Sequence, residues 1–319
     1  MREKKLAALM TPSYIALHER GELAERAGRA RALLEGCTLC PRRCKVNRLE
    51  GEEGQCLVGA EAEVASAGPH FGEEAPLVGS NGSGTIFMSS CNLRCAFCQN
   101  YDISQQERGQ RISAPQFGRL MTDLQLRGCH NINFVTPTHQ VPAILEGLTH
   151  AVDAGLSVPL VYNSSGYDSA DTLKLLDGIF DIYMPDLKTL NSEVAEAYMN
   201  APEYPEVVKT ALREMHRQVG DLVLSSRGIA MRGILLRHLV MPEGKATTRE
   251  AMIFLRDEIS PDTYVNIMAQ YRPAGESSSF PEIDRATTGN EYQEALTIAA
   301  EVGMNRLDER RPKFPHRWE

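Results

Sequence analysis

The sequence predicts an α/β protein built on a partial, TIM-like (β/α)6 barrel that is open on one side and follows an N-terminal helical and cysteine-rich extension. From Gly84 onward, short apolar runs alternate with helical stretches in about six units. Such alternation implies a parallel sheet with right-handed crossovers. Because a closed barrel of this type has eight units, six indicate an open one, and the gap suits a large substrate.

The predicted elements follow one another in regular order. Strands are expected at 85–89, 131–136, 158–163, 181–187, 233–241 and 264–270. Helices are expected at 116–127, 142–154, 169–176, 192–219, 248–259 and 290–302, with a short strand or hairpin at 222–230.

Four segments follow from these patterns. Residues 1–36 are expected to be helical, and 37–83 to be a cysteine-rich, metal-binding segment followed by a connection. Glycine, proline and serine make 60–83 look irregular. The barrel is expected over 84–285, and a C-terminal helix and tail over 286–319.

Composition narrows the class of protein. The 319 residues are 42% hydrophobic and 24% charged, as in soluble globular proteins. A net charge of −8 argues against a nucleic-acid partner. We recognise neither a signal peptide nor a membrane-spanning segment, and expect a cytoplasmic protein. In that reducing compartment, eight cysteines indicate metal binding or catalysis rather than disulfides.

One cysteine group stands directly after the first predicted strand. Cys91, Cys95 and Cys98 have the spacing C-x3-C-x2-C. Three thiolates can hold a cubane four-iron cluster and leave its fourth iron open to a small molecule. A zinc site is the alternative. Zinc would need a fourth ligand nearby, and the candidates Cys129 and His130 both lie far along the chain.

A second group precedes the first and has the spacing C-x2-C-x3-C-x11-C. Its members are Cys37, Cys40, Cys44 and Cys56. Four thiolates are a complete ligand set for structural zinc or for a second cluster, and the sequence leaves both open. Zinc would have a structural role and hold the cysteine-rich segment against the barrel, whereas a cluster would relay electrons or help to position a substrate. Arg42, Arg43 and Lys45 would offset the thiolate charge.

The first motif, with Phe97 before its last cysteine, resembles that of the radical S-adenosylmethionine superfamily. Residues 95–105, 131–139, 162–166 and 181–188 further resemble homologues of the pyruvate formate-lyase activating enzyme, and the likeness spans about 84–273. The resemblance implies a [4Fe–4S] cluster, S-adenosylmethionine bound at its free iron, and reductive cleavage to a 5′-deoxyadenosyl radical that abstracts hydrogen from a substrate. It also implies an external electron donor such as flavodoxin or ferredoxin.

The resemblance assigns cofactor contacts to residues at the ends of the strands. These are Thr136, Pro137, Thr138, Asn163, Ser165, Asp186, Lys188, Arg237 and His238. Thr136-Pro137-Thr138 replaces the Gly-Gly-Glu common in the family, so a backbone contact can persist while the acidic side-chain role cannot. Asp186 and Lys188 match the Asp-Leu-Lys of the activating enzymes. From the residues alone, helix capping by the threonines, a simple ion pair between Asp186 and Lys188, and a core position for His238 remain open.

Three functions stay open at this point. The chain is an activating enzyme that makes a glycyl radical on a partner protein, a radical enzyme acting on a small molecule or another macromolecule, or a non-catalytic iron–sulfur or zinc protein. Gln270, Tyr271 and Arg272, expected to face the substrate, do not separate them. Activating enzymes usually carry their extra cysteines after the first motif, and here the extra group precedes it.

Overall fold

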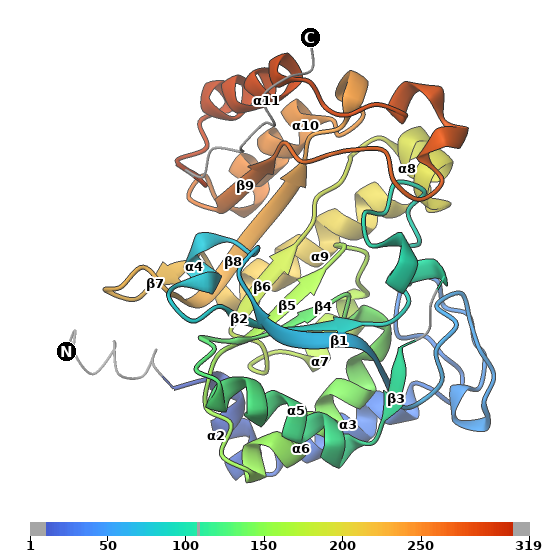
Figure 1. Cartoon of the computed structure of the whole chain (residues 1–319), viewed down its shortest axis with the longest axis vertical. Helices are drawn as coiled ribbons and strands as arrows, with labels where there is room; N and C mark the ends of the chain where they lie inside the picture. Colours follow the sequence, from blue (N-terminus) through green and yellow to red (C-terminus); the bar gives the residue numbers. More distant parts are fainter. Residues whose placement is uncertain (1–10, 107–108, 309–319) are drawn as a thin grey trace.

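The protein is built on one large sheet that does not close on itself (Figure 1). The computed structural model describes residues 11–106 and 109–308. The strand order is β10-β9-β8-β6-β5-β4-β2-β1-β3. Six neighbouring strands run parallel, namely β2 (Ser83–Met88), β4 (Ile132–Val135), β5 (Leu160–Ser164), β6 (Ile182–Pro185), β8 (Ala230–Leu239) and β9 (Tyr264–Met268). The predicted six-stranded partial barrel, open on one side, is therefore confirmed.

Four more strands extend the sheet of the described residues beyond its parallel core. β1 (Ala62–His70) runs antiparallel to β2 and carries β3 (Gln110–Ile112) on its other edge. β10 (Arg306–Leu307) runs parallel to β9 at the opposite end. β7 (Val223–Leu224) pairs antiparallel with β8, so the predicted hairpin near 222–230 is confirmed.

Helices connect the strands in the expected order and flank the sheet (Figure 1). They are α2 (Ser13–Glu19), α3 (Glu22–Ala32), α4 (Ala75–Val78), α5 (Ala114–Leu126), α6 (Val141–Asp153), α7 (Ala170–Leu175), α8 (Ser192–Met199), α9 (Tyr204–Val219), α10 (Thr248–Phe254) and α11 (Gly289–Val302). Single 3-10 or π turns occur at Arg48–Glu50, Asp102–Gln106, Thr138–Gln140, Pro242–Gly244, Leu255–Ile259, Ser277–Ser279 and Pro281–Ile283. Across the part of the chain that the structure describes, no helix has the length and apolarity needed to cross a membrane.

Two predicted elements were wrong. The connection expected to be irregular over 60–83 contains the nine-residue strand β1 and the short helix α4. Gly68 and Pro69 hid this strand, but they are tolerated because β3 pairs only with the first residues of β1 and leaves an open edge. The single helix expected at 192–219 is two helices, α8 and α9. Asn200 ends α8 in a left-handed conformation (φ 46°), and Pro202 and Pro205 follow. The expectations for 1–10 and 309–319 lie outside the described residues.

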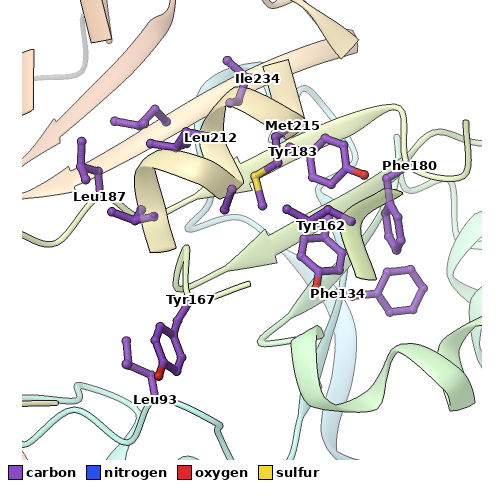
Figure 2. Packing of buried hydrophobic residues seen from close by; sticks show 14 of the residues in the cluster. Leu93, Phe134, Tyr162, Tyr167, Phe180, Tyr183, Leu187, Leu212, Met215 and Ile234 are labelled. Atoms are coloured by element: carbon purple, nitrogen blue, oxygen red, sulfur yellow. The ribbon is translucent and has the colours of Figure 1, made fainter. Parts of the chain in front are cut away.

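Aromatic side chains fill the space between the central strands and their helices (Figure 2). The rings of Tyr162 and Phe180 have centroids 4.9 Å apart, and those of Tyr162 and Tyr183 are 5.6 Å apart, both edge-on. Edge-on contacts of this kind stabilise beyond simple burial. Leu93, from the loop that follows β2, lies beside Tyr167 in Figure 2. The same core therefore holds both the strands and the loop that carries the first cysteine motif.

Candidate functional site

A cavity of about 220 Å³ opens where the parallel strands end. Cys91, Cys95 and Cys98 all line it. The ends of β4, β5, β6, β8 and β9 contribute Thr136, Asn163, Ser165, Asp186, Lys188, Arg237 and Gln270. Met88, Val135, Leu239 and Met268 add apolar surface. The structure thus brings together the motif cysteines and most of the polar residues predicted at the strand ends, in the place where parallel α/β sheets bind ligands.

The loop that carries the motif is tightly tethered. Ser90 and Arg94 have left-handed backbones (φ 68° and 56°), which are strained for residues other than glycine. The Ala96 N–H donates to Tyr198 O at 2.8 Å, and Ala96 O accepts from the Glu276 N–H at 2.7 Å. These bonds fix a tight turn that directs three cysteines to one side.

The motif thiols lie close enough to influence one another. Burial raises the pKa of Cys95, Lys188 lowers it, and the neighbouring thiols raise it further. Burial likewise raises the pKa of Cys91, whose sulfur accepts the Leu93 N–H at 3.3 Å. Among the described residues, no three His, Cys, Asp or Glu side chains are positioned so that they could hold a metal ion together. The ligand roles of the cysteines therefore rest on their shared cavity and on thiolate chemistry.

A network of buried charges forms another part of the cavity wall. Arg237 donates through Nε to Asp186 Oδ1 and through Nη2 to Asn163 Oδ1, both at 2.8 Å. Lys188 Nζ donates to Asp186 Oδ2 at 2.7 Å. Burial disfavours the charge on Asp186, but Arg237 and Lys188 more than offset it and hold the pKa of the carboxyl below its usual value. The network places two fixed cations beside the cavity.

Three predicted contacts are not among the residues that line the cavity. Thr138 Oγ1 donates to the buried carboxylate of Asp168 at 2.6 Å, and Pro137 only precedes it in the same turn. His238 is fully buried; its Nδ1 bonds Leu187 O at 2.7 Å and its Nε2 bonds Thr248 Oγ1 at 3.0 Å. Burial lowers the pKa of His238 to about 4. Alternation along β8 explains the difference, because His238 must face away from the side that Arg237 faces.

Of the three residues expected to face the substrate, only one lines the cavity. Gln270 lines the cavity, but the Tyr271 hydroxyl is buried and donates to Ile283 O at 2.8 Å. Arg272 is not among the lining residues. Cys129 and His130, the alternative metal ligands, do not line the cavity either; His130 Nε2 accepts the Ser80 N–H at 3.2 Å.

Two residues that help to form the site, Asp168 and Glu73, were not predicted from the sequence. Asp168 accepts from Thr138, Tyr162 and Ser164, so one buried carboxylate ties together the ends of β4 and β5. Glu73, from the segment before α4, reaches Arg237 at 3.9 Å. Neither belongs to a motif, and only the pairing of distant segments brings them to the site.

The second cysteine group gathers behind the motif loop. A small void is lined by Cys37, Cys40, Cys44, Cys56, Arg48, Asn92 and His139, among others. Burial raises the pKa of Cys40 to about 12, and the nearby thiols of Cys56 and Cys37 add to the rise. The Gln55 N–H donates to Cys44 Sγ at 3.4 Å, and Arg48 Nη1 donates to Cys37 Sγ at 3.8 Å. Grouped thiols with N–H donors can hold a thiophilic metal.

Comparison with known proteins identifies the class. Residues 85–240 match the model of the Radical SAM superfamily. An uncharacterized protein of Methanocaldococcus jannaschii is 31% identical over 284 residues, which cover 86% of this chain and 78% of that protein. The solved structure of native anSMEcpe with bound AdoMet aligns at 9% identity with a TM-score of 0.41; the alignment covers 67% of this chain and 57% of that one.

The chain belongs to the radical SAM superfamily. Membership supports a radical enzyme that cleaves S-adenosylmethionine, and it implies a [4Fe–4S] cluster, bound S-adenosylmethionine and an external source of electrons.

Proposed function

We propose that Cys91, Cys95 and Cys98 hold the four-iron cluster and that the cavity beside them binds S-adenosylmethionine. The observation that carries this proposal is that all three thiols line the cavity in which the polar strand ends meet. When bound, the cluster supplies the electron that cleaves the sulfonium and releases a 5′-deoxyadenosyl radical. The chain itself binds the cofactor, orients it and keeps water away.

Ser165 supports a cofactor contact at the end of β5. Its Oγ is buried, lines the cavity and has no hydrogen-bond partner within the protein. A buried hydroxyl without a partner is costly, and a ribose hydroxyl or a carboxylate would satisfy it. Asn163 beside it is oriented by Arg237. We assign the polar end of the cofactor to this wall.

The remaining predicted contacts take two kinds of role in this proposal. Thr136 turns the chain with a left-handed backbone (φ 60°) at the cavity, so its backbone is the part that meets the cofactor. Lys188 and Arg237 balance the negative charge of the thiolate-ligated cluster. Thr138 and His238 act indirectly, because they hold the ends of β4 and β8 in place.

Product analysis tests the proposal. The purified protein, loaded with iron and sulfide and reduced without oxygen, should convert S-adenosylmethionine to 5′-deoxyadenosine. Cys95→Ala should abolish the product. Cys129→Ala, at the amino end of β4 and away from the cavity, is the matched control and should retain it. Intact S-adenosylmethionine after reduction of a fully loaded wild type would favour the alternative of a non-catalytic iron–sulfur protein.

We further propose that the radical is passed to a glycine of a partner enzyme in the cytoplasm, with flavodoxin or ferredoxin as the electron donor. The resemblance to activating enzymes and the open sheet, which leaves room for a protein loop, support this reading. A small molecule or another macromolecule is the alternative substrate. Electron paramagnetic resonance of mixtures with candidate glycyl radical enzymes distinguishes them: a glycyl doublet supports activation, and its absence with every candidate supports the alternative.

We also propose that Cys37, Cys40, Cys44 and Cys56 hold a second metal centre, either zinc or an iron–sulfur cluster. The shared void and the N–H donors to its sulfurs support this assignment. Metal analysis of a Cys37→Ser/Cys40→Ser variant names the metal by which element is lost. Unchanged zinc and iron contents would remove the second centre from the account.

A further inference from the structure

The second cysteine group is attached directly to the back of the motif loop. Arg42, two residues after Cys40, donates to Asn92 O at 3.1 Å and to Leu93 O at 3.2 Å. The same guanidinium donates to Met199 O at 2.9 Å and lies 5.1 Å from the centre of the Tyr167 ring. One side chain therefore ties the cysteine-rich segment to the turn between Cys91 and Cys95.

A second arginine ties the segment to the turn after β4. Arg48 is only 3% exposed, and it donates to Gly59 O at 2.6 Å and to His139 O at 2.9 Å. Its remaining polar contact is Cys37 Sγ at 3.8 Å. Among the described residues, no carboxylate lies within ion-pair distance of Arg48. A buried cation without a carboxylate is costly unless another anion compensates it, and thiolates are the groups at hand.

Asn92 and His139 line the void of the second cysteine group and also stand in the two loops that border the cofactor cavity. Asn92 stands between Cys91 and Cys95 in the chain, lines the void, hydrogen-bonds Cys40, and has a buried Oδ1 without a partner. His139 stands in the turn that begins at Thr136 and also lines the void. Its Nε2 must donate to Ser89 O, at 2.9 Å, because a carbonyl only accepts. Its buried Nδ1 is therefore an acceptor, and it has no partner.

We propose that metal binding at Cys37, Cys40, Cys44 and Cys56 sets the geometry of the cofactor cavity, and so controls the affinity for S-adenosylmethionine. The inference rests on the proposed function, in which both cysteine groups hold metal. Arg42 and Asn92 carry the effect to the motif loop, and Arg48 and His139 carry it to the turn of Thr136. With the metal bound, thiolates balance Arg48 and the void is filled. Without the metal, the thiols are protonated, the charge of Arg48 is no longer balanced, and the void is empty, so both loops are held less firmly.

The coupling predicts how two variants change cofactor binding. In Cys37→Ser/Cys40→Ser, the metal of the second centre should be lost while about four irons remain at the motif. The dissociation constant for S-adenosylmethionine should then rise by roughly tenfold or more, within the range usual for coupled sites. Arg42→Met should raise it in the same direction while both metals stay bound. Cys129→Ser, three residues before β4 and away from the cavity, is the control and should bind as the wild type does.

Three measurements on the intact, metal-loaded chain decide the question. They are metal content, equilibrium binding of S-adenosylmethionine, and the electron paramagnetic resonance shift that S-adenosylmethionine causes in the reduced motif cluster. Binding within twofold of wild type in both variants, with the motif cluster full, overturns the coupling. If the double variant also loses the motif cluster, Arg42→Met decides alone. Failure of the wild type to bind S-adenosylmethionine instead refutes the proposed function.

Discussion

Arg237 is the most informative single residue to change, because it joins three walls of the cavity. It lies on β8, bonds Asp186 after β6 and Asn163 on β5, and approaches Glu73 from the segment before α4. Arg237→Met removes the cation while keeping much of the side-chain bulk. We expect lower stability and weaker binding of S-adenosylmethionine, since the walls that hold the cofactor lose their common partner.

The size of the effect follows from the geometry. Removing one member of a buried ion pair costs about 3–5 kcal/mol when the other charge is left without a partner. Asp186 keeps Lys188 at 2.7 Å, so the cost should lie near the lower end, about 3 kcal/mol. Arg237→Lys keeps the charge but cannot reach Asp186 and Asn163 together, and loss of one charged hydrogen bond costs about 1.5–3 kcal/mol.

Urea unfolding under anaerobic conditions at fixed metal loading measures the stability, and equilibrium binding measures the affinity. Adding Asp186→Asn to Arg237→Met should cost less than the sum of the two single changes. Asp186→Asn alone leaves both Arg237 and Lys188 without the carboxylate that they share, whereas the double variant leaves only Lys188 without it. The matched control is Arg249→Met, which breaks an exposed ion pair with Glu301. A loss below about 1 kcal/mol for Arg237→Met, together with unchanged binding, would refute the network.

Three further changes test other parts of the site. Ser165→Ala should leave stability nearly unchanged but weaken S-adenosylmethionine binding by roughly two- to tenfold, the value of one hydrogen bond; equal binding in calorimetry would exclude the contact. His238→Gln tests a buried neutral imidazole. The unfolded chain gains a proton on His238 as pH falls below about 6.5, whereas the folded chain, in which burial lowers the pKa of His238, does so only near 4. Between pH 7 and pH 5 the wild type should therefore lose about 2 kcal/mol more stability than His238→Gln, because the variant keeps only the loss that comes from the buried His139. Parallel pH profiles of urea unfolding would contradict this. Gly166→Ala should cost about 3 kcal/mol, because at φ 75° a Cβ would lie 2.4 Å from Asp186 O. Gly155→Ala, at φ 91° in open space, should cost only about 1 kcal/mol, and equal losses in urea unfolding would remove the role of that close approach.

Local patterns made the parallel core and the cysteine groups predictable from sequence. Strands such as β5 and β8 contain the short apolar runs 160–162 and 234–236, and the C-x3-C-x2-C motif spans eight residues. β1 was not predictable in the same way, because Gly68 and Pro69 favour a turn. Its strand conformation comes from pairing with β2 and β3, which no local pattern contains.

For side chains at the strand ends, sequence predicts the place but not the direction. Thr136 and Thr138 stand in the same turn, yet only Thr136 lines the cavity, because Thr138 bonds the buried Asp168. Arg237 and His238 are adjacent on β8, and alternation means that only one can face inward. That rule was available from sequence, whereas the carboxylate of Asp168 and its three hydroxyl donors could be found only in the fold.

The most direct test of the central claim is the electron paramagnetic resonance spectrum of the reduced protein with and without S-adenosylmethionine. If Cys91, Cys95 and Cys98 hold a cluster with one open iron, the cofactor should shift the wild-type signal. Each single change of these cysteines to alanine should remove the responsive signal, and Cys129→Ala should keep it. A signal that still responds to S-adenosylmethionine in all three motif variants would contradict the account.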